Sequence, residues 1–446
     1  MWIDIAIIVA RAILPFVVML TAVPALIWLE RRLVAWMQAR LGPNRVGPQG
    51  LFQPLADILK LLFKEDYRPA AADWLLFAAA PAFAVMTSFM AFAPIPIGAP
   101  LRIAGHTVVP AGADIEVGLL YITAVLSLGV YAIVLGGWAS DSKYSLLGAM
   151  RSAAQMISYE LSLGLSLVAV AIVAGSLKPS LIVQSQSVWY CLPLLLAAIT
   201  FFIASLAETN RSPFDMPEAE QELVSGFNTE YSALRFGLFF LAEYANLVTA
   251  SALFATCFLG GWSGPLFGPV WLRVILPFVY FLAKVGVLVC TYMWIRATMP
   301  RFRYDQLMFI GWKILLPVTG LNVLLVAAAV SLFPQPQPDQ PFDPAFYAVL
   351  FVSQIVLLAA SYLIGKWMFL RQFGARPRQA TLVKVQSGSI PAFSGLLAVA
   401  VPPSPQERSD AGRGAGGEDA VAVPPSPDDL RSLMESGPGG DAPHVP

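Results

Sequence analysis

The chain has few of the residues that metal and redox proteins use. Its 446 residues include only three cysteines and two histidines. The cysteines lie far apart in apolar stretches and form no CxxC pair, so neither a disulfide framework nor an iron–sulfur site is expected. His106 and His444 have no neighbour at metal-ligand spacing. No Gly-rich phosphate loop follows a strand. The sequence therefore predicts a chain that binds no metal, flavin, haem or iron–sulfur cluster by itself.

Charge is also scarce. Charged residues make up 13% of the chain and hydrophobic residues 57%, against about 25% and 45–50% in soluble domains. The mean hydropathy is +0.68. The 28 basic and 28 acidic residues balance, so nucleic acid is not expected as a partner. This composition predicts an all-α integral membrane protein in contact with membrane lipids.

Apolar runs of about 20 residues mark candidate membrane spans. The N-terminal run has no basic region before it and no small-residue cleavage site, so it is interpreted as a retained span rather than a signal peptide. The membrane domain is expected over residues 1–371, with about nine spans, at 5–29, 74–97, 116–138, 156–176, 188–207, 237–260, 270–295, 313–333 and 345–370.

Lysine and arginine are concentrated in every second loop, which predicts the orientation in the membrane. The first loop is the richest and includes Arg31, Arg40 and Lys64, whereas the opposite loops carry little beyond Arg102 and Lys178. The odd loops and the C-terminus are therefore expected in the cytoplasm, with the N-terminus on the outer side of the membrane.

Two segments outside the spans stand out. Residues 50–64, GLFQPLADILKLLFK, place their apolar side chains on one helical face and Gln53, Asp57, Lys60 and Lys64 on the other. This pattern predicts an amphipathic helix at the membrane interface, within the first cytoplasmic loop. Residues 372–446 are rich in Pro, Gly, Ser, Asp and Arg, which predicts a disordered cytoplasmic tail.

Several ionisable residues lie in or beside the spans. A charge at the bilayer centre costs at least about 2.5–3.5 kcal/mol, so a retained one is a functional candidate. Glu160 and Glu243 each lie inside an apolar run, and Lys284 lies in the seventh span, where it is expected to pair with one of these acids. Glu30 and Glu208 lie at span ends, where solvation or helix capping is an equally good interpretation.

The fifth loop gathers acidic residues around Arg211 on the side expected to be cytoplasmic. Crowded carboxylates raise one another's pKa values and can relay protons, although a solvated acidic face remains an alternative. The acids of this loop are Glu208, Asp215, Glu218, Glu220, Glu222 and Glu230.

Four long motifs resemble one family. They span residues 30–66 (with ERR and QARLGPNRVGPQG), 136–160 (ending SYE), 208–244 (ETNRSPFDMPEAEQELVSGFNTEY to AEY) and 294–308 (WIRATMPRFRYDQLM). Together they closely resemble the H-type membrane subunit of proton-pumping NADH–quinone oxidoreductase, respiratory complex I, over roughly residues 1–335. A ninth span occurs only in some members of that family, and the tail has no recognised counterpart.

The resemblance implies a function. Such a subunit lines much of the tunnel by which the isoprenoid quinone, either ubiquinone or menaquinone, enters from the lipid. Quinone is then a substrate of the whole complex, and this chain holds no complete active site. The implied partners are the quinone-site and terminal iron–sulfur-cluster subunits of the redox arm and small membrane-arm subunits. The acids of such a chain would couple quinone reduction to proton translocation.

Matching the motifs position by position assigns roles to residues. The implied quinone-tunnel residues are Glu30, Arg31, Arg40, Lys64, Glu65, Arg211, Phe240 and Tyr244. The implied proton-coupling path consists of Glu160, Glu208, Asp215, Glu218, Glu220, Glu222, Glu230 and Glu243.

Two other functions remain open from the sequence. One is the related membrane anchor of an energy-converting hydrogenase-type complex, which shares some of the acidic positions. The other is a stand-alone secondary transporter, which would show paired repeats and interrupted helices. Neither feature is evident in the sequence, which makes the transporter the weakest of the three.

Overall fold

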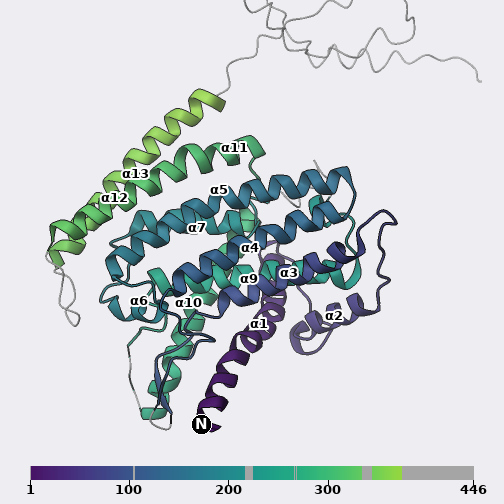
Figure 1. Cartoon of the computed structure of the whole chain (residues 1–446), viewed down its shortest axis with the longest axis horizontal. Coiled ribbons are helices and arrows are strands. Elements are labelled where there is room, and N and C mark those ends of the chain that lie inside the picture. Colours follow the sequence, from purple (N-terminus) through teal and green to yellow (C-terminus); the bar gives the residue numbers. More distant parts are fainter. Residues whose placement is uncertain are drawn as a thin grey trace, which may run out of the picture. The chain divides into compact units, whose positions relative to one another are not determined.

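The chain is almost entirely helical in its computed structural model (Figure 1). The structure describes residues 2–103, 106–215, 225–265, 267, 269–333 and 344–373. This confirms the predicted all-α class. Lipid offers no hydrogen-bond partners, so the backbone N–H and C=O groups of a membrane segment must bond each other, as they do in a helix. The predicted tail lies outside the described residues from position 374 onward.

The helices follow the apolar runs of the sequence. They are α1 (Trp2–Met37), α2 (Gln53–Phe63), α3 (Trp74–Phe92), α4 (Gly118–Ala139), α5 (Lys143–Ala174), α6 (Pro179–Ser185), α7 (Leu195–Glu208), α9 (Ala233–Phe258), α10 (Val270–Thr298), α11 (Tyr304–Phe309), α12 (Leu316–Leu332) and α13 (Pro344–Phe373). A π-helical turn, Ile310–Leu315, joins α11 to α12, and short 3-10 turns cover Pro48–Gly50 and Gly226–Asn228. Two short strands, β1 (Leu101–Ile103) and β2 (His106–Val108), form an antiparallel hairpin in which Leu101 faces Val108.

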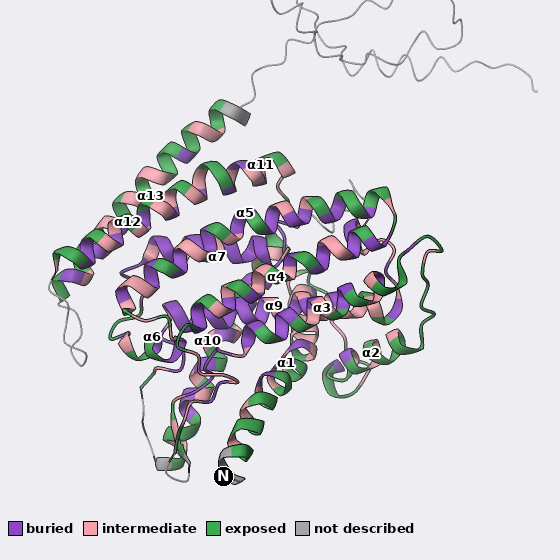
Figure 2. Cartoon of the chain, in the orientation of Figure 1, coloured by how far each residue is buried: buried purple, intermediate pink, exposed green. Residues whose placement is uncertain are grey.

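Helix α9 is central to the packing. It contacts α1, α2, α3, α5, α6, α7 and α10, and Figure 1 shows α3, α4 and α5 following one another beside it. It is also the most buried of the long helices, whereas α1 and α13 expose most of their surface (Figure 2). Functional side chains on α9 are therefore enclosed by protein rather than lipid.

Eight helices among the described residues are long and apolar enough to cross a membrane. Of the nine expected spans, the one at 188–207 is not matched by such a helix. Its helix, α7, has only 14 residues. At 1.5 Å per residue it covers about 21 Å of a hydrocarbon core of about 30 Å. Its first residue, Leu195, lies two positions after Pro193, which disfavours helix at the preceding residue, Leu192. The non-helical residues Tyr190 and Leu194 are fully buried in protein, which makes irregular backbone tolerable at this depth.

Helix α5 begins well before the apolar run 156–176 that marks it in the sequence, at Lys143. Its added turns are rich in Ser, Gly and Gln and pack against the short turn Gly226–Asn228. Ser145 Oγ donates to the carbonyl of Phe227 at 3.2 Å. A Cβ on Gly148 would lie 2.6 Å from Gly226 Cα, so only glycine permits this approach. An apolar run marks the part of a helix that contacts lipid. The first turns of α5 pack against protein, so hydropathy does not reveal them.

The predicted amphipathic helix is observed as α2. Its apolar residues Leu55, Leu59 and Leu62 are exposed on this chain, as expected for a helix that contacts lipid. On its polar face, Gln53 donates to Asp57 Oδ1 at 3.1 Å and Arg31 pairs with Asp57 Oδ2 at 2.6 Å. This ion pair ties α2 to the end of α1.

Helix α13 is held by a buried polar contact. Gln354 donates from Nε2 to Asn322 Oδ1 of α12 at 2.6 Å, and its Oε1 accepts from the backbone N–H of Leu196 at 3.2 Å. Gln354 is fully buried. Leu196 belongs to the first turn of α7, where N–H groups have no helical acceptor. Helix α13 therefore supplies the N-terminal cap of α7.

We expect Gln354→Leu to speed amide exchange in the first turn of α7. Losing the contact should cost about 1 kcal/mol, which is roughly a fivefold change in opening. Hydrogen exchange of the assembled complex, followed by mass spectrometry, measures this on peptides that cover residues 195–200. Ser353→Ala is the matched control, because Ser353 Oγ donates to Leu350 O of its own helix. Equal exchange in both variants would contradict the capping role.

Candidate functional site

A buried cluster of charges surrounds Glu30 at the C-terminal part of α1. Its carboxylate accepts from Tyr244 Oη at 2.7 Å and forms a short ion pair with Arg296 Nη1. Arg211 Nη1 lies 3.4 Å from both carboxylate oxygens. Glu30 is only 8% exposed, so its charge depends on these three partners rather than on solvent.

Arg211 extends this cluster to a second acid. It follows the last turn of α7, where its N–H donates to Leu206 O at 3.2 Å. Its Nε lies 2.8 Å from Glu243 Oε1, and its guanidinium stacks 4.3 Å from the centre of the Tyr244 ring. Burial disfavours its charge, but Glu243, Tyr244 and Glu30 outweigh that cost and raise the pKa of Arg211 above its usual range. The cation is therefore permanent, and the order of charges is Glu243, Arg211, Glu30, Arg296.

An open cavity of about 520 Å³ lies against one side of this cluster. Helices α1, α9 and α10 contribute to its wall, together with α2 and the segment that follows α1. Its lining combines ionised groups with apolar side chains: Glu30, Arg31, Val34, Ala35, Arg40, Leu41, Gly42, Pro43, Gln53, Phe240, Tyr244 and Arg296. Its volume falls in the range of small-molecule sites, about 300–1,000 Å³.

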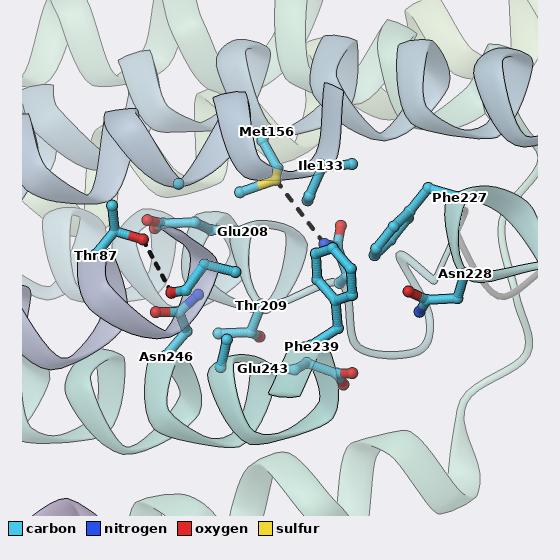
Figure 3. A pocket seen from close by; sticks show the side chains of 14 residues that line it. Thr87, Ile133, Met156, Glu208, Thr209, Phe227, Asn228, Phe239, Glu243 and Asn246 are labelled. Carbon is cyan, nitrogen blue, oxygen red and sulfur yellow. Dashed lines mark hydrogen bonds between the residues drawn. The ribbon is translucent and has the colours of Figure 1, made fainter. Parts of the chain in front are cut away.

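A second cavity, smaller and more enclosed, has a volume of about 60 Å³ (Figure 3). Glu208 from α7 and Glu243 and Asn246 from α9 line it, together with Thr87 of α3. Several water molecules would fit, and the polar side chains could bond them. Glu243 therefore reaches both the Arg211–Glu30 cluster and a polar interior cavity.

Glu208 also lines a third, very small cavity that continues toward α4 and α5, lined in part by Leu126 and Leu163. In this direction lies Glu160, which accepts a short hydrogen bond from Ser127 Oγ of α4. Glu160 and Glu208 are close enough to interact electrostatically. The acids Glu160, Glu208, Glu243 and Glu30 thus form one series from the interior to the open cavity.

The structure brings most of the implied tunnel residues together. Glu30, Arg31, Arg40, Phe240 and Tyr244 all line the open cavity, and Arg211 contacts it through Glu30. Lys64 and Glu65 do not line it; both are exposed just after α2. The two residues therefore lie on the surface of the chain, where α2 ends.

The implied coupling residues divide into three groups. Glu160, Glu208 and Glu243 belong to the interior series. Asp215 lies apart and pairs with Arg301 Nη2 at 3.0 Å, and half-exposed Glu230 precedes α9. The remaining acids, Glu218, Glu220 and Glu222, lie outside the described residues.

One sequence expectation about a buried charge is wrong. Within the part of the chain that the structure describes, Lys284 pairs with no acid. Its Nζ donates to the backbone oxygens of Leu259, Gly261 and Ser263 at 2.7, 2.9 and 2.8 Å. These carbonyls follow the end of α9, where oxygens lack helical partners. The ammonium also lies 5.2 Å from the centre of the Trp189 ring. Lys284 is thus a capping residue at the C-terminal end of α9.

Sequence reasoning missed Arg296 and Asn246. Arg296 lies within the recognised WIRATMPRFRYDQLM motif, and its place at the end of an apolar run could have marked it as a partner for Glu30. Asn246 follows Glu243 by three residues, and that spacing places both side chains on one face of α9. Among the described residues, no three His, Cys, Asp or Glu side chains are arranged to hold a metal ion.

Comparison with known proteins identifies the family. Residues 10–327 match the family described as NADH dehydrogenase. The chain is 53% identical over 330 residues to an H-type NADH-quinone oxidoreductase subunit of Geobacter metallireducens, covering 74% of this chain and 98% of the relative. It is 47% identical over 337 residues to the corresponding H-type subunit of Rhodospirillum centenum, covering 74% and 95%. The chain therefore belongs to the NADH dehydrogenase family, as a membrane subunit of the H type found in NADH-quinone oxidoreductase, complex I.

Proposed function

We propose that this chain forms the membrane part of a quinone-access tunnel and the first part of the proton-coupling path of complex I. The observation that carries the proposal is the position of Arg211. It bridges Glu30, which lines the open cavity, and Glu243, which lines the interior cavity. The relatives' names favour this function over a hydrogenase-type anchor or a stand-alone transporter.

The open cavity suits the two chemical parts of an isoprenoid quinone. Val34, Leu41 and Phe240 offer apolar contacts for the tail. Arg31 and Arg40 face the same cavity and would stabilise the negative charge that develops on the head during reduction. Reduction is completed on partner subunits of the redox arm, where a terminal iron–sulfur cluster supplies electrons. Flavin, haem and cluster binding are assigned to those partners and not to this chain.

The interior series of acids provides the coupling. A negative charge that develops beside Glu30 would change the field at Arg211 and therefore at Glu243. Glu243 would pass this change through the hydrated interior cavity to Glu208 and then to Glu160. From there the signal or the proton would continue into neighbouring membrane-arm subunits. Glu30, Arg211 and Glu243 are joined by direct contacts, Glu243 and Glu208 line one cavity, and Glu208 and Glu160 interact electrostatically.

The charges at the cavity support an orientation in the bacterial inner membrane. The open cavity lies at the end of α1 and the end of α10, beside the first loop with its many basic residues. We infer that this side is cytoplasmic and that the N-terminus lies outside. With α7 and its buried non-helical residues counted as one crossing, the chain crosses the membrane nine times and the C-terminus is cytoplasmic.

Narrowing the cavity tests the tunnel. We expect Val34→Trp to raise the apparent KM for a long-tailed quinone at least tenfold, because indole would fill space that the tail needs. NADH-driven quinone reduction in membranes measures this, with assembly checked first. The control is Val17→Trp on the same helix, where Val17 is 51% exposed and faces away from the cavity lining. An unchanged KM in Val34→Trp would contradict the tunnel assignment.

A further inference from the structure

The last described helix, α13, is attached to α12 unevenly. In its first part, Phe346, Leu350 and Gln354 recur every four residues and are fully buried. Phe346 packs edge-on against Phe333 with ring centres 5.5 Å apart, and Gln354 bonds Asn322. The first half of α13 is therefore firmly docked against the membrane domain.

The second half of α13 presents the same face to α12 but does not pack closely against it. A groove of about 140 Å³ separates it from α12. The α12 side contributes Lys313, Ile314, Pro317, Val318 and Leu321, and the α13 side contributes Leu357, Ala360, Ser361, Ile364, Gly365 and Met368. Small side chains on α13 keep the groove open; a Cβ on Gly365 would already lie 3.4 Å from Ile314 Cδ1.

The chemistry of the groove changes along its length. Most of it is apolar, and its rim residues Leu321 and Ile364 are exposed to the surrounding medium. The exposed Lys313 lies at one end, on the π-helical turn, with its ammonium 5.1 Å from the centre of the Phe309 ring. The exposed Trp312 adjoins it, and tryptophan prefers the level of lipid headgroups. The groove therefore runs from acyl-chain depth to a cation at headgroup depth.

We propose that this groove binds one anionic phospholipid, with an acyl chain between α12 and α13 and the phosphate on Lys313. Two kinds of membrane molecule have a long apolar chain that could enter the groove, an isoprenoid quinone and a phospholipid, and they differ in the charge of the head. An isoprenoid quinone has a neutral head and gains little from an ammonium, whereas an anionic lipid gains about 1 kcal/mol from one nearby lysine. The site requires only that α12 and α13 cross the membrane, so it is independent of the quinone tunnel.

The test uses the assembled complex in lipid nanodiscs that contain phosphatidylglycerol with a photoactivatable acyl chain. We expect labelling within residues 313–321 and 357–368. Lys313→Gln should lower this labelling about fivefold, the change that corresponds to about 1 kcal/mol. Lys366→Gln is the matched control, because Lys366 is exposed on α13 and does not line the groove. It should change labelling less than twofold.

A second variant examines the groove itself. Gly365→Leu fills the space beside Ile314 and should abolish labelling by any lipid. Phosphatidylcholine with the same photoactivatable chain should label the wild type more weakly than phosphatidylglycerol. Three results would each overturn the proposal: equal labelling by both lipids, equal effects of the two lysine variants, or stronger labelling by a photoactivatable isoprenoid quinone.

Discussion

Arg211→Met is expected to lower NADH-driven quinone reduction at least tenfold and to destabilise the membrane domain. The substitution removes the cation between Glu30 and Glu243, and the Arg211 side chain is only 3% exposed. Removing one partner of a buried ion pair costs about 3–5 kcal/mol, because the remaining charge loses its compensation. Thermal unfolding and steady-state turnover of the purified complex measure the two effects.

Arg235→Met is the matched control for Arg211→Met. Arg235 pairs with Asp66 at 3.2 Å, but both side chains are partly exposed, and such pairs contribute about 0–1 kcal/mol. If Arg211→Met prevents assembly, Arg211→Lys keeps the charge and should restore assembly with reduced turnover. Wild-type stability and turnover in Arg211→Met would show that the bridge has no role.

Glu243→Gln is expected to reduce quinone-linked turnover and proton pumping together, each at least tenfold. The amide keeps the volume of the side chain but cannot bind and release a proton, and it weakens the contact with Arg211 Nε. Pumping is measured with a pH-sensitive dye in sealed membrane vesicles, and turnover by NADH oxidation in the same vesicles.

The control for Glu243→Gln is Glu116→Gln, an exposed acid just before α4. This variant should retain both activities, because its carboxylate belongs to neither cavity. If Glu243→Gln also retains both, the carboxylate series is not the coupling path, although the family assignment stands.

The membrane helices were predictable because burial in lipid selects apolar residues locally. Where a helix contacts protein, that signal fails, as at the polar first turns of α5. Pro193 disfavours helix at Leu192, but the apolar run 188–207 does not specify that α7 starts at Leu195. The partners of Lys284 were not predictable, because they are backbone carbonyls, which every residue type carries.

The site was predictable as a set of residues but not as an arrangement. Glu30 and Arg211 stand out as charged residues beside the apolar spans, and Tyr244 was found because its motif resembles a known family. Their contacts join residues separated by 181 and 214 positions, which no local pattern specifies. Arg296, the fourth member of the cluster, was missed for the same reason, since it is 266 residues from Glu30. Which of these residues line which cavity depends on how α9 packs against its neighbours.

The cluster around Glu30 also sets an order of events during synthesis. Its last partner, Arg296, lies 266 residues further along the chain. At about 5–20 residues per second, a ribosome needs roughly 13–53 seconds to reach it. Until Arg211, its first cationic partner, is made 181 residues after it, the carboxylate at the end of α1 must stay hydrated or be shielded by insertion factors. The open cavity therefore completes its charged lining only after α10, which carries Arg296, has been made.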